Sequence, residues 1–439
     1  MTAEVAVMNK LAVALAADSA VTFGDTERRK IYNAANKLFA LSKREPIGVM
    51  IYGSAELMGV PWETILKMYR DKLGDRVFPR LSDYFEDVIA FLDTNDHFFD
   101  KKTQERSVLR NATSMFFLVR NDVVEGIDEV LVKQQKISDS EIAQIVDLVI
   151  SNYLQRYRDR DFSTGLDEAH HQRLVSTYQA AIRLQIDRVF EKLPLTDQQI
   201  DGLIQLGASL ACRDVLPEYK SGMVIAGFGH DDHFPCLRAV EMDVRAGDRL
   251  HYLVVHEQDI SAESGAAIVP FAQRDVVSLF VEGIDSNYEE MLYGFLEKTF
   301  AEYPDELQKS LPSLTADDRA AISDRSKRVG AMVIERFRQR TQQYVQEKYV
   351  QPMMSVVEAL PKSELAALAE AFVNLTSLKR RVSMDLETVG GPVDVAVISK
   401  GDGLVWIQRK HYFKPELNHQ FFRNYFRAEP SPDRETDAY

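Results

Sequence analysis

The sequence is poor in cysteine and has no long hydrophobic run. Its two cysteines, Cys212 and Cys236, cannot form a disulfide framework, and neither lies in a metal-ligand pair such as CxxC. No apolar run reaches the ~18 residues expected of a membrane span. We therefore expect a chain from the reducing cytoplasm, with no membrane partner.

Basic residues are outnumbered by acidic ones. The chain has 53 Lys and Arg against 67 Asp and Glu, a net charge of −14. Coating nucleic acid needs concentrated positive charge, so no nucleic-acid partner is expected. The sequence also has no P-loop, dinucleotide fingerprint, Ser-His-Asp motif or zinc signature. We predict no cofactor and no metal.

The remaining composition is that of a globular protein. Apolar residues make up 45% and charged residues 27% of 439 positions, which allows about three domains or one elaborated core. Residues 11–17 and the following Asp18-Ser19-Ala20 imitate a secretory signal and its cleavage site. The preceding residues include Glu4 and a single basic residue, Lys10, so we expect no export.

Strand patterns occupy both ends of the chain and a central stretch. The first 53 residues alternate as strands, with a turn at Asn9-Lys10. Further strands are expected at these segments: residues 113–120, 222–227, 251–256, 275–281, 393–398 and 404–407.

Helical patterns fill the stretches between. Ser54 is expected to cap a helix containing Ile65 and Tyr69, and another helix is expected over residues 81–92. Residues 138–215 are helical, with capping boxes that begin at Ser138 and Thr196. Helices are also predicted over residues 286–380, interrupted at Pro304, Pro312 and Pro361. This order suits two stacked sheets with helices on their outer faces.

Residues 227–233 contain a candidate metal site that has a simpler explanation. His230, Asp231, Asp232 and His233 are metal-ligand types, but they fall between two strands, where Asp and Gly form a hairpin turn. We interpret this segment as a turn.

The N-terminus offers a reactive group. A Met followed by a small residue is normally trimmed, which would leave Thr2 with a hydroxyl and a free α-amine. The amine, with a pKa near 7.7–8.0, can serve as the general base that a weak hydroxyl nucleophile requires.

Several segments in order resemble the proteasome β subunits and the related bacterial ATP-dependent peptidase, which are N-terminal nucleophile (Ntn) hydrolases. Residues 2–22, with Leu-Ala-Ala-Asp18, resemble the family's opening hairpin. Residues 36–39 resemble its Lys-hydrophobic-Phe strand, and residues 49–54 the strand that ends in the oxyanion-hole glycine. Three C-terminal segments also match: residues 223–227, residues 283–297, and Asp385-x-x-Thr388 with Gly390-Gly391 and residues 392–398.

The resemblance implies a four-layer αββα sandwich of the α+β class and a set of roles. Thr2 would be the nucleophile, Lys37 would lower the pKa of its hydroxyl, and Asp18 would orient Lys37. Gly53 would donate its N–H to the oxyanion. The remaining site residues implied are Ser286, Asp385 and Thr388 around the amine, and Thr22, Ile51 and Ala55 along the substrate.

The sequence departs from the family in three places. Val389 adds a residue before Gly390, the turn at Asp285-Ser286 lacks a second glycine, and Tyr52 replaces a usual alanine, which predicts a crowded cleft. Long helical segments also have no counterpart in compact members. We expect one Ntn-hydrolase domain over residues 1–427, with core segments 1–124, 220–296 and 363–413, helical insertions 125–219 and 297–362, and a flexible tail 428–439.

The predicted function is a threonine peptidase that cleaves peptide bonds in an extended chain. Its expected partners are a peptide or unfolded protein substrate, further copies of itself and an ATP-dependent unfoldase. Two alternatives stay open: a small-molecule amidase of the same superfamily, and a catalytically silent assembly subunit with the same fold.

Overall fold

The computed structural model describes residues 3–23, 30–191, 193–309, 315–383, 389–411, 413–420 and 423. The strands are β1 (Ala3–Asn9), β2 (Val13–Ala17), β3 (Val21–Phe23), β4 (Lys30–Tyr32), β5 (Leu38–Ala40), β6 (Ile47–Gly53), β7 (Glu56–Leu57), β8 (Val60–Pro61), β9 (Ser221–Gly227), β10 (Cys236–Ala246), β11 (Arg249–Asp259), β12 (Ala266–Ala272), β13 (Asp394–Ser399) and β14 (Gly403–Gln408).

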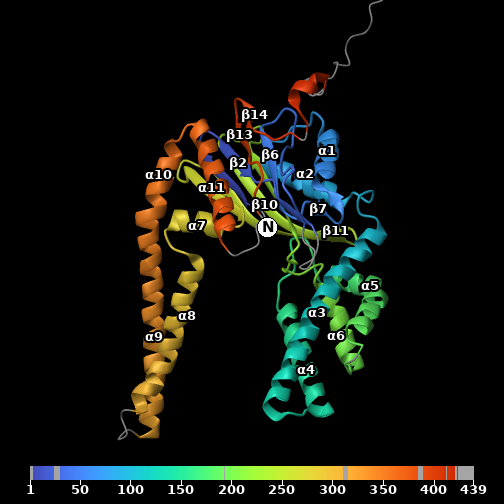
Figure 1. Cartoon of the computed structure of the whole chain (residues 1–439), viewed down its shortest axis with the longest axis vertical. Helices are drawn as coiled ribbons and strands as arrows, with labels where there is room; N and C mark the ends of the chain where they lie inside the picture. The colour runs from blue at the N-terminus through green and yellow to red at the C-terminus, as the bar shows by residue number, and fades with distance from the viewer. Residues whose placement is uncertain are drawn as a thin grey trace, which may run out of the picture.

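The helices lie in two long stretches between the strands, with shorter ones beside them (Figure 1). They are α1 (Trp62–Leu73), α2 (Leu81–Asp93), α3 (Lys101–Gln134), α4 (Asp139–Arg158), α5 (Glu168–Val189), α6 (Asp197–Ser209), α7 (Asp275–Glu282), α8 (Ser286–Lys309), α9 (Ala316–Val345), the π-helical turn η1 (Gln346–Val350), α10 (Gln351–Ala359), α11 (Lys362–Val382) and the 3-10 turn η2 (Pro415–Leu417).

Two antiparallel sheets form the centre of the molecule. Within the described residues, sheet A has the strand order β12-β1-β2-β13-β14, and sheet B has the order β11-β10-β9-β6-β5. Both sheets combine strands from distant parts of the chain. Helices and antiparallel sheets together confirm the expected mixed α+β class.

Three apolar cores explain why both sheets are buried on both faces. One core lies between the sheets and contains Met8 and Leu15 from sheet A with Met50 and Val224 from sheet B. Alternate residues of β1 point to the other face, where Val5 packs beneath α11. With both faces covered, apolar residues occur on both sides of these strands, as in β1 and β2.

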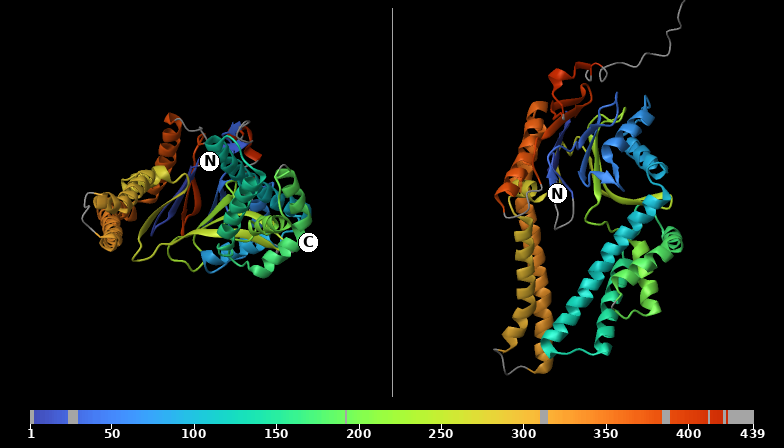
Figure 2. Two further views of the ribbon diagram at one scale, coloured as in Figure 1. Left: turned by 90° about the horizontal axis from the view of Figure 1, so that it is seen from below. Right: turned by 45° about the vertical axis from the view of Figure 1, so that its right-hand side comes forward.

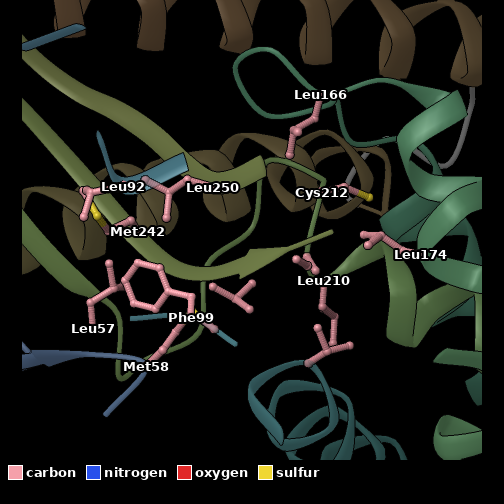
Figure 3. Packing of buried hydrophobic residues seen from close by; sticks show 14 of the residues in the cluster. Leu57, Met58, Leu92, Phe99, Leu166, Leu174, Leu210, Cys212, Met242 and Leu250 are labelled. Carbon is pink, nitrogen blue, oxygen red and sulfur yellow. The ribbon is translucent and has the colours of Figure 1, made fainter. Parts of the chain in front are cut away.

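The third core lies between sheet B and the helices α1, α2 and α3 and continues into α5 and α6. Figure 3 shows Leu57, Met58, Phe99 and Met242 from one part of it. The largest fully buried side chains include Trp62 and Tyr69 of α1, so α1 is fixed directly behind β6. This packing fixes the segment that follows β6.

Most of the predicted elements are confirmed. The turn at Asn9-Lys10, the strands at residues 48–53, 222–227 and 251–256, and the C-terminal hairpin all form. The capping boxes at Ser138 and Thr196 begin α4 and α6 as expected. Pro361 lies at the N-cap of α11.

Two predicted strands are wrong. Residues 113–120 lie inside the long helix α3, and residues 275–281 form α7. Short apolar runs do not distinguish a strand from a buried helix. In α3 the buried residues Ala112, Phe116, Val119 and Val123 follow a helical spacing, while Phe117 and Leu118 are exposed.

Three local predictions also need correction. Ser54 does not cap a helix, because residues 56–61 form the β7–β8 hairpin and α1 begins at Trp62. Pro304 lies inside α8 and does not interrupt it, whereas Pro312 lies outside the described residues. The boundaries expected at residues 124/125 and 296/297 fall within α3 and α8, so the helical segments begin earlier than expected. Residues 428–439 also lie outside the described part of the chain.

Two helical units extend away from the sheets in the same general direction. One is the α8–α9 hairpin, and the other is a bundle of α3, α4, α5 and α6. Figure 2 shows that the N-terminal end of β1 lies at the end of the sheets from which both units extend. They flank this end of the molecule, and α3 of the bundle also packs on sheet B.

Candidate active site

The N-terminal end of β1 is bonded directly to Asp18, at the end of β2. The backbone N–H of Ala3 donates to Asp18 Oδ1 at 3.2 Å, and the Asp18 N–H donates to the Ala3 carbonyl at 3.1 Å. These bonds continue the β1–β2 pairing, whose last regular pair is Glu4 with Ala17. The residue that follows Thr2 is therefore fixed beside the Asp18 carboxylate.

The Asp18 carboxylate is buried and fully surrounded by donors. Its Oδ2 accepts from the backbone N–H of Ala20 at 3.2 Å and of Gly390 at 2.9 Å. The Ser19 N–H donates back to the Gly390 carbonyl at 3.1 Å, so the loop before β13 packs on this turn. With only 1% of the residue exposed, backbone N–H groups replace the water that an ionised carboxylate needs.

Lys37 brings a buried cation to the same point. Its Nζ forms an ion pair with Asp18 Oδ1 and lies 3.2 Å from Glu4 Oε1. The exposed fraction of the Lys37 side chain is 7%, and that of Glu4 is 0%. The Lys37 carbonyl accepts from Ile51 N at 2.9 Å, which fixes the residue beside β6. One ammonium thus lies between two buried carboxylates.

Glu4 is a site residue that the sequence analysis missed. It belongs to the face of β1 that points between the sheets, together with Ala6 and Met8. The available signal was a single carboxylate among the apolar residues 3–8 of a strand that is buried throughout. A buried charge in such a strand requires a partner of opposite sign, and Lys37 is that partner.

A second buried lysine–aspartate pair lies next to the first. Asp394 of β13 is aligned with Ala17, accepts from Lys410 N at 2.8 Å and forms an ion pair with Lys410 Nζ. Burial lowers the pKa of Lys410 and the nearby Lys37 charge adds to this, whereas Asp394 opposes it. The sequence analysis did not anticipate this pair.

Gly53 ends β6 in a conformation that requires glycine. Its φ is +73°, and a Cβ added there would lie 2.5 Å from the Lys220 carbonyl oxygen. Any other residue would be strained and would collide with the backbone just before β9. Gly53 lies two residues beyond Ile51, whose N–H is bonded to Lys37, and it is exposed.

The segment after Gly53 is fixed by buried polar contacts. Ser221 Oγ accepts from Trp62 Nε1 at 3.1 Å and lies 3.1 Å from the Ser54 carbonyl and 2.9 Å from the Glu56 carbonyl. Ala55, expected along the substrate, is half-buried in this turn, and its carbonyl accepts from Trp62 N at 3.1 Å. Gly53 is therefore held between a regular ladder and a rigid turn.

Ile51 and Tyr52 point to opposite faces of sheet B. The Ile51 side chain is 2% exposed and belongs to the core beneath α1, so it presents almost no surface to a substrate. The Tyr52 ring lies between the sheets, over Gly222, and stacks on Phe271 with ring centroids 5.5 Å apart. Its hydroxyl donates to Glu241 Oε1 at 3.2 Å, and burial is the main cause that raises its pKa. The Tyr52 ring, which was expected to crowd the cleft, thus fills space in the core between the sheets.

The junction between β12 and α7 lies on the other side of β1. Ala272 is paired with Ala3 and has a φ of +59°, an unusual value for alanine. Gln273, which follows, is buried, and its Oε1 accepts from Arg380 Nε at 2.7 Å. Strained non-glycine residues of this kind often occur at functional sites. Sequence reasoning missed this junction because it treated residues 275–281 as a strand.

The other residues expected at the site have separate positions. Thr2, Asp385 and Thr388 lie outside the described residues. Thr22 lies in β3, whose backbone pairs with β4 at Ile31. Ser286 is exposed at the first residue of α8, beyond α7, and the structure does not bring it to Lys37 and Asp18.

The segment with the metal-ligand residue types forms a turn, as interpreted. Asp232 Oδ2 accepts from the backbone N–H of Gly229 and of Leu81, each at 2.8 Å. The Lys400 ammonium donates to carbonyls in the same turn, including that of Gly229 at 2.9 Å. No group of three or more His, Cys, Asp or Glu suited to a metal ion occurs among the described residues.

Within the described part of the chain, no helix is both long and apolar enough to cross a membrane. No family model matches the sequence, and comparison with curated proteins gives no match either.

Proposed function

We propose that this chain is a proteasome-like Ntn hydrolase with Thr2 as its nucleophile, bared by removal of Met1. In this proposal, sheets A and B and the helices on their outer faces are the four-layer αββα sandwich of that superfamily. The α8–α9 hairpin and the α3–α6 bundle are additions to it. The chemistry depends on the terminus, and the fold alone does not establish it.

One observation supports the proposal above the others. The buried Lys37–Asp18 pair lies at the beginning of β1, and Asp18 is bonded to the backbone of Ala3. Thr2 precedes Ala3 in the chain, and in this proposal its hydroxyl and amine act beside this buried, oriented ammonium. A desolvated cation beside a hydroxyl favours the alkoxide that attacks a carbonyl.

The proposed reaction proceeds in two steps. Thr2 Oγ attacks the substrate carbonyl carbon while the α-amine of Thr2 accepts the hydroxyl proton. The Gly53 N–H stabilises the oxyanion, the C–N bond breaks, and the leaving amine takes the proton. Water then hydrolyses the ester, which releases the acid and restores the hydroxyl.

One feature favours a peptide over a small amide as the substrate. Within the described residues, β3 and β4 form a separate two-stranded sheet, to which an extended peptide can add along Thr22. A cytoplasmic peptidase that receives unfolded chains from an ATP-dependent partner fits this arrangement.

The test is hydrolysis of fluorogenic peptides by the purified chain, together with its intact mass. We expect a mass without Met1, and a fall in kcat of at least about 10³-fold in both Thr2→Ala and Lys37→Ala. Thr177→Ala, on the exposed surface of α5, should retain full activity. Circular dichroism checks that the variants fold.

Each alternative gives a different result. Thr2-dependent hydrolysis of small amides without cleavage of any peptide would identify an amidase. Retention of Met1 with no hydrolysis by the wild type would identify a silent assembly subunit. Full peptidase activity in Thr2→Ala would refute the assigned nucleophile.

A further inference from the structure

The α8–α9 hairpin is held together by a narrow contact between its two helices. The side chains buried in this contact include Tyr293 of α8 and Ser323 and Ile334 of α9. Gly330 of α9 lies against the side chain of Phe300, where a Cβ would approach within 2.8 Å. Arg338 and Glu297 form an ion pair at 3.3 Å beside it. Each helix thus uses one stripe of residues to pack on the other.

Both helices expose a second stripe of large apolar side chains. On α8 these residues are at least 55% exposed, and on α9 at least 43%. They are Tyr288, Phe295 and Tyr303 on α8, and Val329, Val333, Phe337 and Tyr344 on α9. Single exposed apolar residues are normal, but a contiguous set of this size marks an interaction surface.

The two exposed stripes lie on one face of the hairpin. With about 100° of rotation per residue, each exposed stripe is rotated by roughly 100° from the stripe that packs on the other helix. The rotation has the same sense in both helices. Because the helices run antiparallel, equal rotations from their shared contact bring both stripes to the same side. We call this surface the hairpin face.

The hairpin face has the geometry of half of a four-helix bundle. In such a bundle each helix packs against two neighbours whose directions differ by about a right angle. Each helix of the hairpin packs against the other helix, and its exposed apolar stripe is free to pack against a second helix. Figure 1 shows the α3–α6 bundle well separated from the hairpin, so it does not supply that neighbour.

The charges of the hairpin indicate which neighbour completes the bundle. By sequence, α8 has six acidic residues and two lysines, whereas α9 has seven Lys and Arg and four acidic residues. A second copy related by a two-fold axis can place α8 beside α9 of its partner, so that opposite charges meet along both seams. A self-complementary surface of this kind favours a symmetric dimer.

We propose that the hairpin face joins two copies of this chain into a dimer through a four-helix bundle. The surface is remote from β1 and does not depend on the proposed hydrolase chemistry. The Thr2→Ala variant should therefore dimerise as well as the wild type. A failure of the peptidase proposal leaves this inference untouched, and the reverse also holds.

The test is the molar mass of the full chain by light scattering over a range of concentrations. The wild type should have twice the chain mass of 50.0 kDa, and Phe295→Asp and Val333→Asp should each shift the dimer toward monomer by at least tenfold in dissociation constant. Leu148→Asp is the matched control, because Leu148 of α4 and Phe295 have the same exposed fraction of 63%. It should remain dimeric.

Circular dichroism and thermal melting show whether the variants fold. A variant that fails to fold is replaced by reversal of the α9 charges, Arg336→Glu with Arg340→Glu, which should also weaken the dimer. A monomeric wild type at all concentrations, or an oligomer unchanged by Phe295→Asp, Val333→Asp and the charge reversal, would overturn the proposal. Either result would mean that another partner, or none, covers the hairpin face.

Discussion

Lys37 is the residue on which the proposed chemistry most depends, and its surroundings are unusually acidic. Asp18 and Glu4 both reach its ammonium, and neither carboxylate has more than 1% of its residue surface exposed. A single carboxylate would suffice to balance the charge. The second one leaves these three side chains with a formal net charge of −1 at the beginning of β1.

This excess charge leads to a prediction for Glu4→Gln. Glutamine keeps the shape of the side chain and removes its charge, so the α-amine of Thr2 has one anion fewer to stabilise its protonated form. Only the unprotonated amine can accept the hydroxyl proton. The acidic limb of the pH–rate profile should therefore move to lower pH, by roughly half a unit or more.

The control is Glu263→Gln, an exposed carboxylate in the turn before β12, which should leave the profile unchanged. A merely structural role of Glu4 would lower stability without a shift in the pH dependence. An unaltered acidic limb in folded Glu4→Gln would therefore exclude an electrostatic role.

At the scale of residues, the resemblance to the Ntn hydrolases singled out Asp18, Lys37 and Gly53. The structure brings Asp18 and Lys37 into contact, and Gly53 ends the strand whose Ile51 is bonded to Lys37. Glu4 and Lys410 were missed because their partners come from other strands, which only the folded sheet places nearby. Ser286 was selected from a short turn pattern and lies away from them.

At the scale of elements, a buried polar network fixes the α3–α6 bundle to sheet B. His251 Nδ1 lies 2.8 Å from Asp243 Oδ1, and its Nε2 lies 2.8 Å from Ser163 Oγ. Asn111 of α3 donates to the other Asp243 oxygen and accepts from the Tyr219 hydroxyl. The network joins β10, β11, α3 and the loop after α4.

This Ser–His–Asp arrangement resembles a catalytic set, but its burial indicates a structural role. His251 is 0% exposed, and the exposed fractions of Ser163 and Asp243 are 3% and 5%, so no substrate can reach them. The His251 Nε2 also lies 2.8 Å from the Arg213 carbonyl. The chain therefore uses these residues to attach the helical bundle.

Removal of the Asp243 carboxylate, the centre of this network, should strongly lower the stability of the fold. Asp243→Ala leaves His251 and Asn111 buried without their partner, and we expect a loss of about 3–5 kcal/mol in the free energy of unfolding. Asp122→Ala removes an exposed hydrogen bond from Tyr153 and should cost about 0–1 kcal/mol. Urea unfolding followed by circular dichroism compares the two. Equal losses would contradict the role assigned to the network.

The elements differ in how well the sequence predicts them. Capping boxes and glycine-bounded strands were located correctly, because local contacts determine them. The strands predicted at residues 113–120 and 275–281 were wrong, because helical packing on a sheet determines those segments. The order of the strands could not be predicted from the sequence pattern, because β1 pairs with β12 and β2 with β13 across long stretches of chain.

At the scale of the whole molecule, two separate proposals concern two separate regions. In the first proposal the terminus reacts beside Lys37, and in the second the hairpin face joins two chains. If both are correct, each dimer has two reactive termini next to its helical units. The purpose of the long helices would then be assembly, outside the reaction itself.

The most direct test of the central claim is covalent labelling with a threonine-directed epoxyketone, located by mass spectrometry of peptides. The proposed mechanism predicts a single adduct on Thr2, at the N-terminus of a chain that lacks Met1, together with loss of peptide hydrolysis. An adduct elsewhere, or an unlabelled chain that retains Met1, would contradict it.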